Sequence, residues 1–370
     1  MKTILFALLI AIAGTSATTA APAAAPGRET EALSRPGHVL EIRRDGRREL
    51  MHVEGAADIE QRRAIDEHTV FHIASLSKQI TAATLAHAIL DGLVSLEDPV
   101  ANWVPAVAKY GDGLTVAHLL YMTSGLTEYY ERPRPGGAPW STFHYFTIDD
   151  AIAASLSAEE LAFAPGTAWG YSNINYMLIA KIVEAAYEKP FADIAEERLF
   201  APLGMSATLV NDDVTTLIPN RANAYVPRTP EITEDLRSDA AINADAAGGP
   251  LMLIRRNAPH YGGSGVMTSM ADWGRWLDEM QSRAVFGEAF WTLMLRTERF
   301  AHDKTNDAFG LVYGVEADRP VLWYAGGDID ASSYMMVFPD EKISISCFSN
   351  APRESCREHV EREVRRLFPG

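Results

Sequence analysis

The segment Ser75-Leu76-Ser77-Lys78 places a hydroxyl group and an amine three residues apart at the start of a long apolar stretch. Residues i and i+3 lie on the same face of a helix, so the Ser75 oxygen and the Lys78 nitrogen can meet there. The run from Ser75 to Leu90 contains no charged residue except Lys78, which predicts a buried helix. Burial favours a neutral amine that can take the proton of a serine, and the helix N-terminus favours an oxyanion. The alternative is a lysine that reaches solvent beside an unrelated serine.

A second group of reactive side chains follows about a hundred residues later, in the segment PGTAWGYSNINY over 165–176. Pro165-Gly166 indicates a turn, so Tyr171 and Asn173 are expected on a loop before an apolar helix over roughly 176–187. Beside an ammonium group, Tyr171 can act as a general base or a proton shuttle. Asn173 can hold Lys78 with one end of its amide and a substrate carbonyl with the other. The alternative is a packed tyrosine followed by an asparagine that caps a helix.

These motifs belong to a longer pattern that resembles the serine β-lactamase and penicillin-binding-protein superfamily. The resemblance is to the branch with class C β-lactamases, D-amino-acid-specific peptidases and related esterases. It extends over FHIASLSKQITAA (71–83), DGLVSLEDPV (91–100), LTVAHLLYMTSGL (114–126), LFAPLGMSAT (199–208), GGSGVMTSMADWGRW (262–276) and SSYMMVFPDEK (332–342). The resemblance implies that Ser75 is the acylated nucleophile, that Lys78 and Tyr171 manage its proton, and that Asn173 positions the substrate.

The resemblance also implies an α+β fold of the β-lactamase and transpeptidase type, an antiparallel sheet flanked by helices with an inserted, mainly helical region. The residue pattern itself predicts a hairpin, other strands and a final helix at 38–44, 48–55, 310–314, 321–325, 333–338, 342–349 and 354–367. We therefore assign 36–94 and 263–370 to the sheet region and 95–262 to the insertion. The implied active-site groove lies between them, with Ser75 and Tyr324 on the sheet side and Tyr171 on the helical side.

The third family element differs in this chain. Relatives usually carry Lys-Thr-Gly or His-Thr-Gly on a late strand, where the basic residue binds a substrate carboxylate and the following N–H completes the oxyanion hole. The matching segment here is Tyr324-Ala325-Gly326-Gly327, so a tyrosine replaces the basic residue. The Gly326-Gly327 backbone can still approach an acyl carbonyl closely. A substrate carboxylate loses its usual partner, unless Arg255 or Arg256 enters the groove.

Other positions depart from the family as well. Ile329-Asp330-Ala331 replaces a Pro-Gly-aromatic pattern, and Met122 stands where the HTSGL motif commonly has histidine. Some esterases of the family also carry an aromatic residue in place of the basic one, which favours uncharged esters. We expect the polar region 211–256 to shape the pocket.

The start of the chain has the pattern of a targeting signal. Met1-Lys2 is positive, residues 4–13 are apolar and residues 15–25 are small, so 1–20 are predicted to be a signal peptide. Residues 21–35, rich in proline and alanine, are predicted to be a flexible lead-in. The apolar run is too short for a membrane span and no cysteine offers lipid attachment. We expect an exported protein, periplasmic or secreted, with no stable membrane anchor after cleavage.

Charge, cysteine content and histidine spacing limit the kinds of partner, covalent bond and metal site that this chain can have. A net charge of −16 disfavours nucleic acid and anionic membranes. Cys347 and Cys356 are either a disulfide in an oxidising compartment or two separate packed thiols. His68 and His72 have a metal-like spacing, but on a strand four residues separate side chains by about 13 Å. We predict no metal and no cofactor.

Two function classes remain. The first is an exported serine hydrolase that forms an acyl-enzyme at Ser75 with an ester or amide, and within it an esterase is preferred to a β-lactamase or a D-amino-acid-specific peptidase because of Tyr324. The second is a catalytically silent member of the family that binds cell-wall peptide or another protein. A small molecule or a peptide is the expected substrate, and the oligomeric state stays open.

Overall fold

The computed structural model describes residues 33–134, 136–137, 140, 145–229, 250–256, 258–297, 307–352 and 355–369. The predicted signal peptide 1–20 and most of the lead-in 21–35 lie outside these residues. Within the described ranges, no helix combines the length and the apolar character that crossing a lipid bilayer requires.

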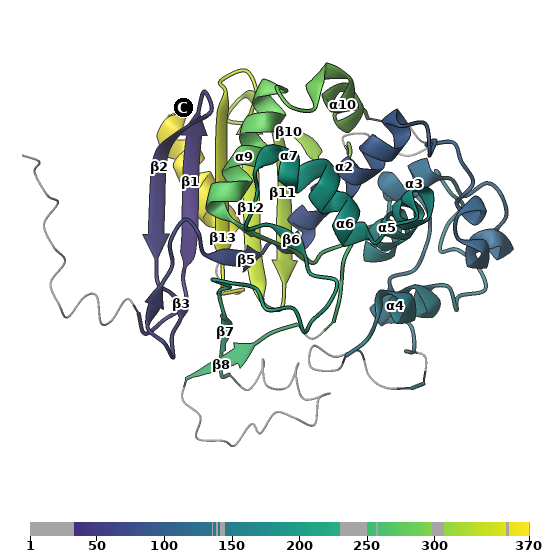
Figure 1. The fold of residues 1–370 in the computed structure, drawn as a ribbon, viewed down its shortest axis with the longest axis horizontal. Coiled ribbons are helices and arrows are strands. Elements are labelled where there is room, and N and C mark those ends of the chain that lie inside the picture. Colours follow the sequence, from purple (N-terminus) through teal and green to yellow (C-terminus); the bar gives the residue numbers. More distant parts are fainter. Residues whose placement is uncertain are drawn as a thin grey trace, which may run out of the picture.

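Six antiparallel strands form the main sheet, in the order β10-β11-β12-β13-β1-β2 (Figure 1). Their bounds are β1 His38–Arg44, β2 Arg47–Glu54, β10 Val312–Glu316, β11 Arg319–Asp328, β12 Ala331–Phe338 and β13 Ile343–Ser349. β1 pairs with β13 along its whole length, so early and late segments of the chain share one sheet, as predicted. β11 is longer than the predicted 321–325, because its pairing with β12 continues to Asp328 opposite Ala331. Gly326 and Gly327 therefore lie inside the strand.

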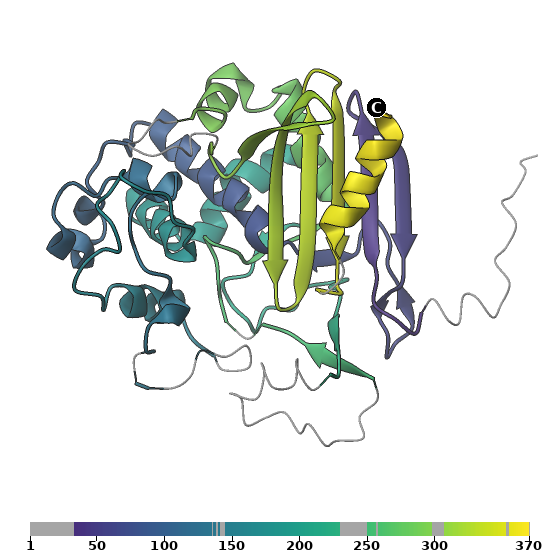
Figure 2. The ribbon, with the colours of Figure 1, turned by 180° about the vertical axis from the view of Figure 1, so that it is seen from behind.

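The C-terminal helix α11 (Cys356–Leu367) covers one face of the sheet, against β12 and β13 (Figure 2). Val360 and Val364 on its inner side are buried in one apolar cluster with Ile345. A disulfide joins Cys347 of β13 to Cys356, so the two cysteines are paired rather than separate thiols. The bond ties the first turn of the helix to the sheet.

The opposite face of the sheet packs against the large apolar core that contains α2 (Ser77–Leu90), α9 (Met270–Ser282) and α10 (Gly287–Met294). α2 follows η1 (Ala74–Leu76), which is one turn of 3-10 helix, and is buried on nearly all sides. This agrees with its sequence, in which Lys78 is the one charged residue, since a helix that is apolar nearly all round avoids water. Lys78 is carried into this interior with no exposed surface.

A mainly helical region lies beside the sheet (Figure 1). Its helical elements are η2 Val100–Asn102, η3 Pro105–Tyr110, α3 Val116–Leu120, η4 Tyr129–Glu131, α4 Ile148–Ser155, α5 Asn173–Tyr187, α6 Phe191–Ala195, the π-helical turn η5 Glu196–Phe200 and α7 Ala201–Leu203. The segment also holds the short strands β6 Leu209–Val210, β7 Ala224–Pro227 and β8 Leu251–Ile254. α5 packs against α2 and begins at Asn173, earlier than the predicted 176.

Small sheets connect these parts. β5 (Val70–His72) pairs with β9 (Val266–Ser269), which also pairs with β6. Two more pairs are β3 (Ala56–Asp58) with β4 (Arg63–Ala64), and β7 with β8. Because β5 runs directly into η1, its pairing with β9 sets the place of the turn that carries Ser75.

Candidate active site

Ser75 lies in η1, the turn between β5 and α2. The backbone N–H of Ile73 donates to Val266 O at 3.2 Å, and Ser333 Oγ donates to Ile73 O at 2.7 Å, so β9 and β12 both hold this turn. Ala74 has a φ of +47°, in the left-handed region that a residue with a Cβ rarely adopts. Such backbone outliers concentrate at functional sites. The nucleophile candidate therefore sits on a constrained turn.

The amine of Lys78 makes three polar contacts. Its Nζ donates to Gly263 O at 2.5 Å, to Asn173 Oδ1 at 2.7 Å and to Ser75 Oγ at 3.2 Å. An ammonium group has three N–H donors, and these three contacts use all of them. The contact to Ser75 is the longest. When the amine is neutral, its lone pair can face the Ser75 hydroxyl while the two shorter bonds remain.

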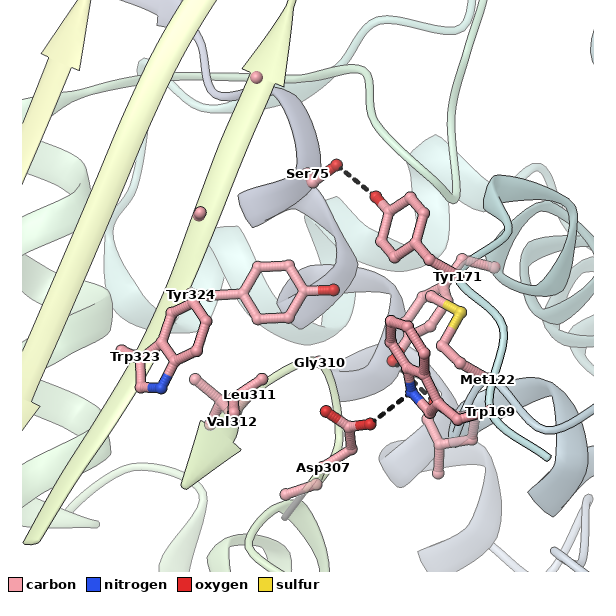
Figure 3. A pocket seen from close by; sticks show the side chains of 15 residues that line it. Ser75, Met122, Trp169, Tyr171, Asp307, Gly310, Leu311, Val312, Trp323 and Tyr324 are labelled. Carbon is pink, nitrogen blue, oxygen red and sulfur yellow. Dashed lines mark hydrogen bonds between the residues drawn. The ribbon is translucent and has the colours of Figure 1, made fainter. Parts of the chain in front are cut away.

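Tyr171 approaches the nucleophile from the helical side of the cavity (Figure 3). Its phenol oxygen is 2.7 Å from Ser75 Oγ and donates weakly to Asn173 Oδ1 at 3.4 Å. Lys78 Nζ lies 4.9 Å from the centre of its ring. The side chain is 42% exposed, so it borders both the interior and the open cavity. Ser75 Oγ thus has two hydrogen-bond partners, the buried Lys78 amine and the partly exposed Tyr171 phenol.

Asn173 opens α5, and a buried carboxylate holds its backbone. Glu128 Oε2 accepts from the Asn173 N–H at 2.5 Å, while Oε1 accepts from the Tyr129 N–H at 3.0 Å. Burial raises the pKa of the Glu128 carboxyl, while these two donors and the charge of Lys78 act in the opposite direction. Sequence reasoning missed Glu128. The available signal was its position, two residues beyond the family-like segment LTVAHLLYMTSGL.

Gly326 brings β11 against the nucleophile turn. A Cβ at this position would lie 2.2 Å from Ser333 Oγ, 2.6 Å from Ile73 O and 3.1 Å from Ser75 N. Only glycine permits this approach. Gly327, the next residue, lines the cavity, and a Cβ there would meet no atom within 4 Å. Gly326 therefore lies against the turn that carries Ser75, and Gly327 lines the same cavity as Ser75.

A cavity of about 350 Å³ opens in front of Ser75 (Figure 3). Aromatic and aliphatic side chains form most of its walls, from Leu120, Met122, Trp169, Tyr171, Tyr176, Leu311, Val312, Trp323 and Tyr324. Asp307 is the one charged side chain among the described lining residues, and its Oδ2 accepts from Trp169 Nε1 at 2.7 Å. No described residue of the region 211–256 lines this cavity, so the prediction that this region shapes the pocket is wrong for its described part; residues 230–249 lie outside the described chain.

Tyr324 points from β11 into the cavity (Figure 3). Burial, and then the phenols of Tyr171 and Tyr176, raise the pKa of Tyr324 well above its usual range. The side chain is therefore a neutral hydrogen-bond donor at physiological pH. It does not replace the positive charge that the family usually has at this position.

The arginines that could have replaced this charge are engaged elsewhere. Arg256 forms an ion pair with Asp328, and Arg255 donates to Asn223 Oδ1 at 3.1 Å. Burial alone would lower the pKa of Arg256, but the Asp328 carboxylate outweighs it and raises the pKa. Neither arginine lines the cavity.

Asp330, in the altered segment 329–331, forms an ionic cluster with His72, Arg256 and Asp328. Asp330 Oδ1 is 2.7 Å from His72 Nδ1, and Ser264 Oγ is 2.8 Å from His72 Nε2. Burial would raise the pKa of Asp330, but His72 and the arginines outweigh it and lower the pKa. His68, in contrast, is exposed beside Glu67, so the two histidines do not face a common ligand.

Two other histidines, His118 and His260, pack within or against the helical region. His118 contacts Thr115 within the capping box of α3, and burial lowers its pKa. His260 is buried against Tyr129, and burial, followed by the charge of Arg256, lowers its pKa to about 3. Neither histidine lines the cavity.

Comparisons with known proteins agree with this geometry. The family model described as Beta-lactamase matches residues 25–367. The D-aminopeptidase of Gluconobacter oxydans is 29% identical over 210 residues, which cover 57% of this chain and 37% of that protein. Esterase EstB of Burkholderia gladioli is 31% identical over 180 residues, which cover 46% of this chain and 45% of that protein. The matches thus span less than half the length of these relatives.

The fold has solved counterparts. The octameric penicillin-binding protein homologue from Pyrococcus abyssi superposes with a TM-score of 0.73 at 20% identity, over 92% of this chain and 74% of that chain. At this identity the likeness concerns the fold alone. It confirms the expected α+β architecture of antiparallel sheet and flanking helices.

Proposed function

The chain belongs to the β-lactamase family, and on that basis we propose that it is a serine hydrolase that forms an acyl-enzyme at Ser75. One observation carries the proposal. Ser75 Oγ lies 2.7 Å from the Tyr171 hydroxyl and 3.2 Å from the buried Lys78 amine. A nucleophile with a base in hydrogen-bond reach, held in turn by a third group, is the arrangement that covalent catalysis needs. Asn173 is that third group.

In the proposed mechanism, neutral Lys78 takes the proton of Ser75, either directly or through Tyr171, while Oγ attacks the carbonyl carbon of the substrate. The backbone N–H groups of Ser75 and Gly327 stabilise the oxyanion, and the proton then passes to the leaving alcohol or amine. A water molecule then attacks the acyl carbonyl carbon and gives one proton to Lys78 or Tyr171, the bond between Ser75 Oγ and the acyl carbon breaks, and the acid leaves while that proton returns to Oγ. Serine regains its hydrogen at the end of the cycle.

We propose an ester with an uncharged acyl group as the substrate. The cavity walls are mainly apolar, Tyr324 is neutral, and the one charged lining side chain described, Asp307, is acidic. Arg256, held by Asp328, does not line the cavity. A substrate carboxylate would meet this acidic group and, among the described lining residues, no basic partner. The apolar walls favour a short aliphatic or aromatic acyl chain.

A second candidate substrate is the amide of an amino acid with a free amino group. Asp307 lies among the rings of Trp169, Tyr176 and Tyr324, and a carboxylate with aromatic faces is an environment that attracts an ammonium group. The relative named D-aminopeptidase supports keeping this candidate within the same mechanism.

The test begins with a fluorophosphonate and intact mass measurement. We expect one adduct on the wild-type chain and none on Ser75→Ala. Labelling of another residue in Ser75→Ala, or no labelling of the wild type, would reject the acyl-enzyme and favour a binding protein. Rates on p-nitrophenyl butyrate, D-phenylalanine amide, a chromogenic cephalosporin and a D-Ala-D-Ala peptide then rank the substrates.

The double variant Tyr324→Lys with Ala325→Thr tests the specificity. A charge-assisted hydrogen bond to a carboxylate contributes about 1.5–3 kcal/mol, or about 10- to 150-fold in relative kcat/KM. We expect the cephalosporin and the D-Ala-D-Ala peptide to gain on the ester by such a factor. An unchanged ratio in a folded double variant would refute the role given to Tyr324.

We also propose that the protein is exported. The support is the order of a positive start, an apolar core and small residues in 1–25. Amino-terminal sequencing of protein from the periplasm or medium should begin between about Thr18 and Ala25. Recovery of chains that begin at Met1 in the cytoplasm would contradict export.

A further inference from the structure

Glu128 is a buried carboxylate that the proposed mechanism does not use. It is 4% exposed, immediately before η4, and its two oxygens accept from the backbone N–H groups of Tyr129 and Asn173. It also bonds the side chain of Asn173 and interacts with the charge of Lys78. Burying a carboxylate costs free energy. A buried carboxylate that contacts Asn173, a direct partner of Lys78, therefore needs an explanation.

The side-chain amide of Asn173 can point either way, and its two ends have opposite hydrogen-bonding character. Lys78 Nζ at 2.7 Å requires the oxygen on its side, and the NH2 group then needs an acceptor. Glu128 is that acceptor. One N–H of the amide then bonds to the carboxylate, and in the proposed mechanism the second donates to the substrate carbonyl.

We propose that Glu128 is a positioning residue, which fixes the amide orientation of Asn173 and sets the charge environment of Lys78. The proposal rests on the acyl-enzyme mechanism proposed above. Glu128 does not touch the substrate; it acts through Asn173 and through its negative charge behind the amine.

The other titratable side chains near Lys78 are phenols and an imidazole. They are Tyr171 and Tyr176, whose rings face the amine at 4.9 and 5.8 Å, and His260 in the loop before β9. Burial raises the pKa of Tyr176 and lowers that of His260, so both are neutral. Glu128 is therefore the one carboxyl among these groups, and its ionised form contributes the negative charge that Lys78 experiences.

The experiment measures fluorophosphonate labelling of Ser75 and hydrolysis of p-nitrophenyl butyrate from about pH 5 to 10, a range chosen for the titration of lysine and tyrosine side chains. We expect Glu128→Gln to slow labelling by roughly 10²-fold, as for a slightly misplaced catalytic group, with kcat reduced and KM little changed. The acidic limb of kcat/KM should move to lower pH, because no anion then stabilises the ammonium form of Lys78.

Two matched variants separate this role from a merely structural one. Glu128→Asp keeps the charge and should keep the wild-type acidic limb even where its rate is reduced. Glu131→Gln, an exposed acid in the same turn, should behave as the wild type. A Glu128→Gln variant with the wild-type labelling rate and the wild-type acidic limb of kcat/KM would overturn the proposal. A reduction in kcat/KM that is equal at every pH would overturn it as well.

A substrate-free measurement keeps the inference separate from the proposed function. NMR of the full chain with 13Cε-labelled lysine, with the Lys78 signal assigned through Lys78→Met, reports the protonation of the amine directly. We expect its titration midpoint at lower pH in Glu128→Gln than in the wild type. An equal midpoint overturns the role of Glu128, whereas an unlabelled wild-type chain overturns the proposed function and leaves this NMR comparison intact.

Discussion

Lys78 and Arg256 are both largely buried cationic side chains, but their partners differ. Lys78 is bonded by the neutral oxygens of Ser75, Asn173 and Gly263, with the carboxylate of Glu128 beyond Asn173. Arg256 is paired directly with Asp328. A cation held by neutral acceptors can lose its proton without leaving a buried anion in contact with it. A cation paired with a carboxylate cannot, so it contributes to structure rather than to proton transfer.

The two regions are also connected through the chain. Asp328 follows Gly327 on β11, and Ser264, which contacts His72, follows Gly263, the carbonyl partner of Lys78. The ionic cluster thus anchors both the strand beside Ser75 and the loop beneath Lys78. Changes in the Lys78 region should affect rate, and changes in the Arg256 region should affect stability.

The largest effect is expected from Lys78→Met. Loss of the proton acceptor should slow acylation of Ser75 by about 10²- to 10⁴-fold, while circular dichroism still shows a folded chain. Lys109→Met is the matched control, because Lys109 is another lysine whose amine donates to neutral acceptors, the backbone carbonyls of Leu156 and Ala158, but it lies outside the cavity lining. Near wild-type acylation in Lys78→Met would remove the distinction between the two cations.

Arg256→Met should reverse the balance between rate and stability. Removal of one partner leaves the Asp328 carboxylate buried, which costs about 3–5 kcal/mol in the free energy of unfolding. Urea denaturation at pH 7 measures this loss, and labelling of the folded protein should slow by less than about tenfold, below the range for a lost acid–base group. Arg255→Met, at a more exposed position, should change the free energy of unfolding little. The double variant Arg256→Met with Asp328→Leu should regain the stability that Arg256→Met loses, because no unpaired carboxylate is then buried. Wild-type stability in Arg256→Met would contradict the structural role.

His260 lies between the two regions, since its pKa is lowered to about 3 by burial and then by the charges of Arg256 and Lys78 among others. Neither of its ring nitrogens has a hydrogen-bond partner in the described structure. Below pH 6.5 the unfolded chain binds a proton there that the folded chain does not, so stability is lost as pH falls from 6.5 towards 3. The slope approaches about 1.4 kcal/mol per pH unit.

His260→Phe should flatten this dependence. Urea denaturation of the wild type and of His260→Phe between about pH 7 and pH 4 would show the difference in pH dependence. A free histidine and then carboxyl groups titrate over this span. Parallel curves for the two proteins would mean that His260 takes up a proton without unfolding.

The smallest effect is expected from Asp330→Asn. The folded-state pKa of Asp330 is below 3.8, so its contribution to stability is complete above that pH and is lost as the pH falls below it. The variant keeps an acceptor for His72 but loses the charge, which should cost about 1–3 kcal/mol at pH 7. The difference from the wild type should shrink below pH 3.8, as followed by acid denaturation. A constant difference would assign the cost to packing instead.

Local patterns were enough to predict much of this molecule. Three features depend on neighbours in the chain: the spacing of Ser75 and Lys78, the run of α2 in which Lys78 is the one charged residue, and the hairpin between 38–44 and 48–55. The structure has the corresponding helix and hairpin. Alternating residues in the last third predicted the late strands, with errors at their ends because pairing with a partner strand, as in β11 to Asp328, decides where a strand stops.

Tertiary structure alone decided which distant groups meet. Glu128 reaches Asn173 across 45 positions and Lys78 reaches the Gly263 carbonyl across 185, and no local periodicity carries such pairings. The same holds for Arg256, which was expected as a possible groove cation and is instead held by Asp328. The disulfide between Cys347 and Cys356 was left open because the packing of α11 on β13 determines whether the two sulfur atoms face each other. Residue types set what chemistry is available, and the burial created by the fold selects which of those groups can perform it.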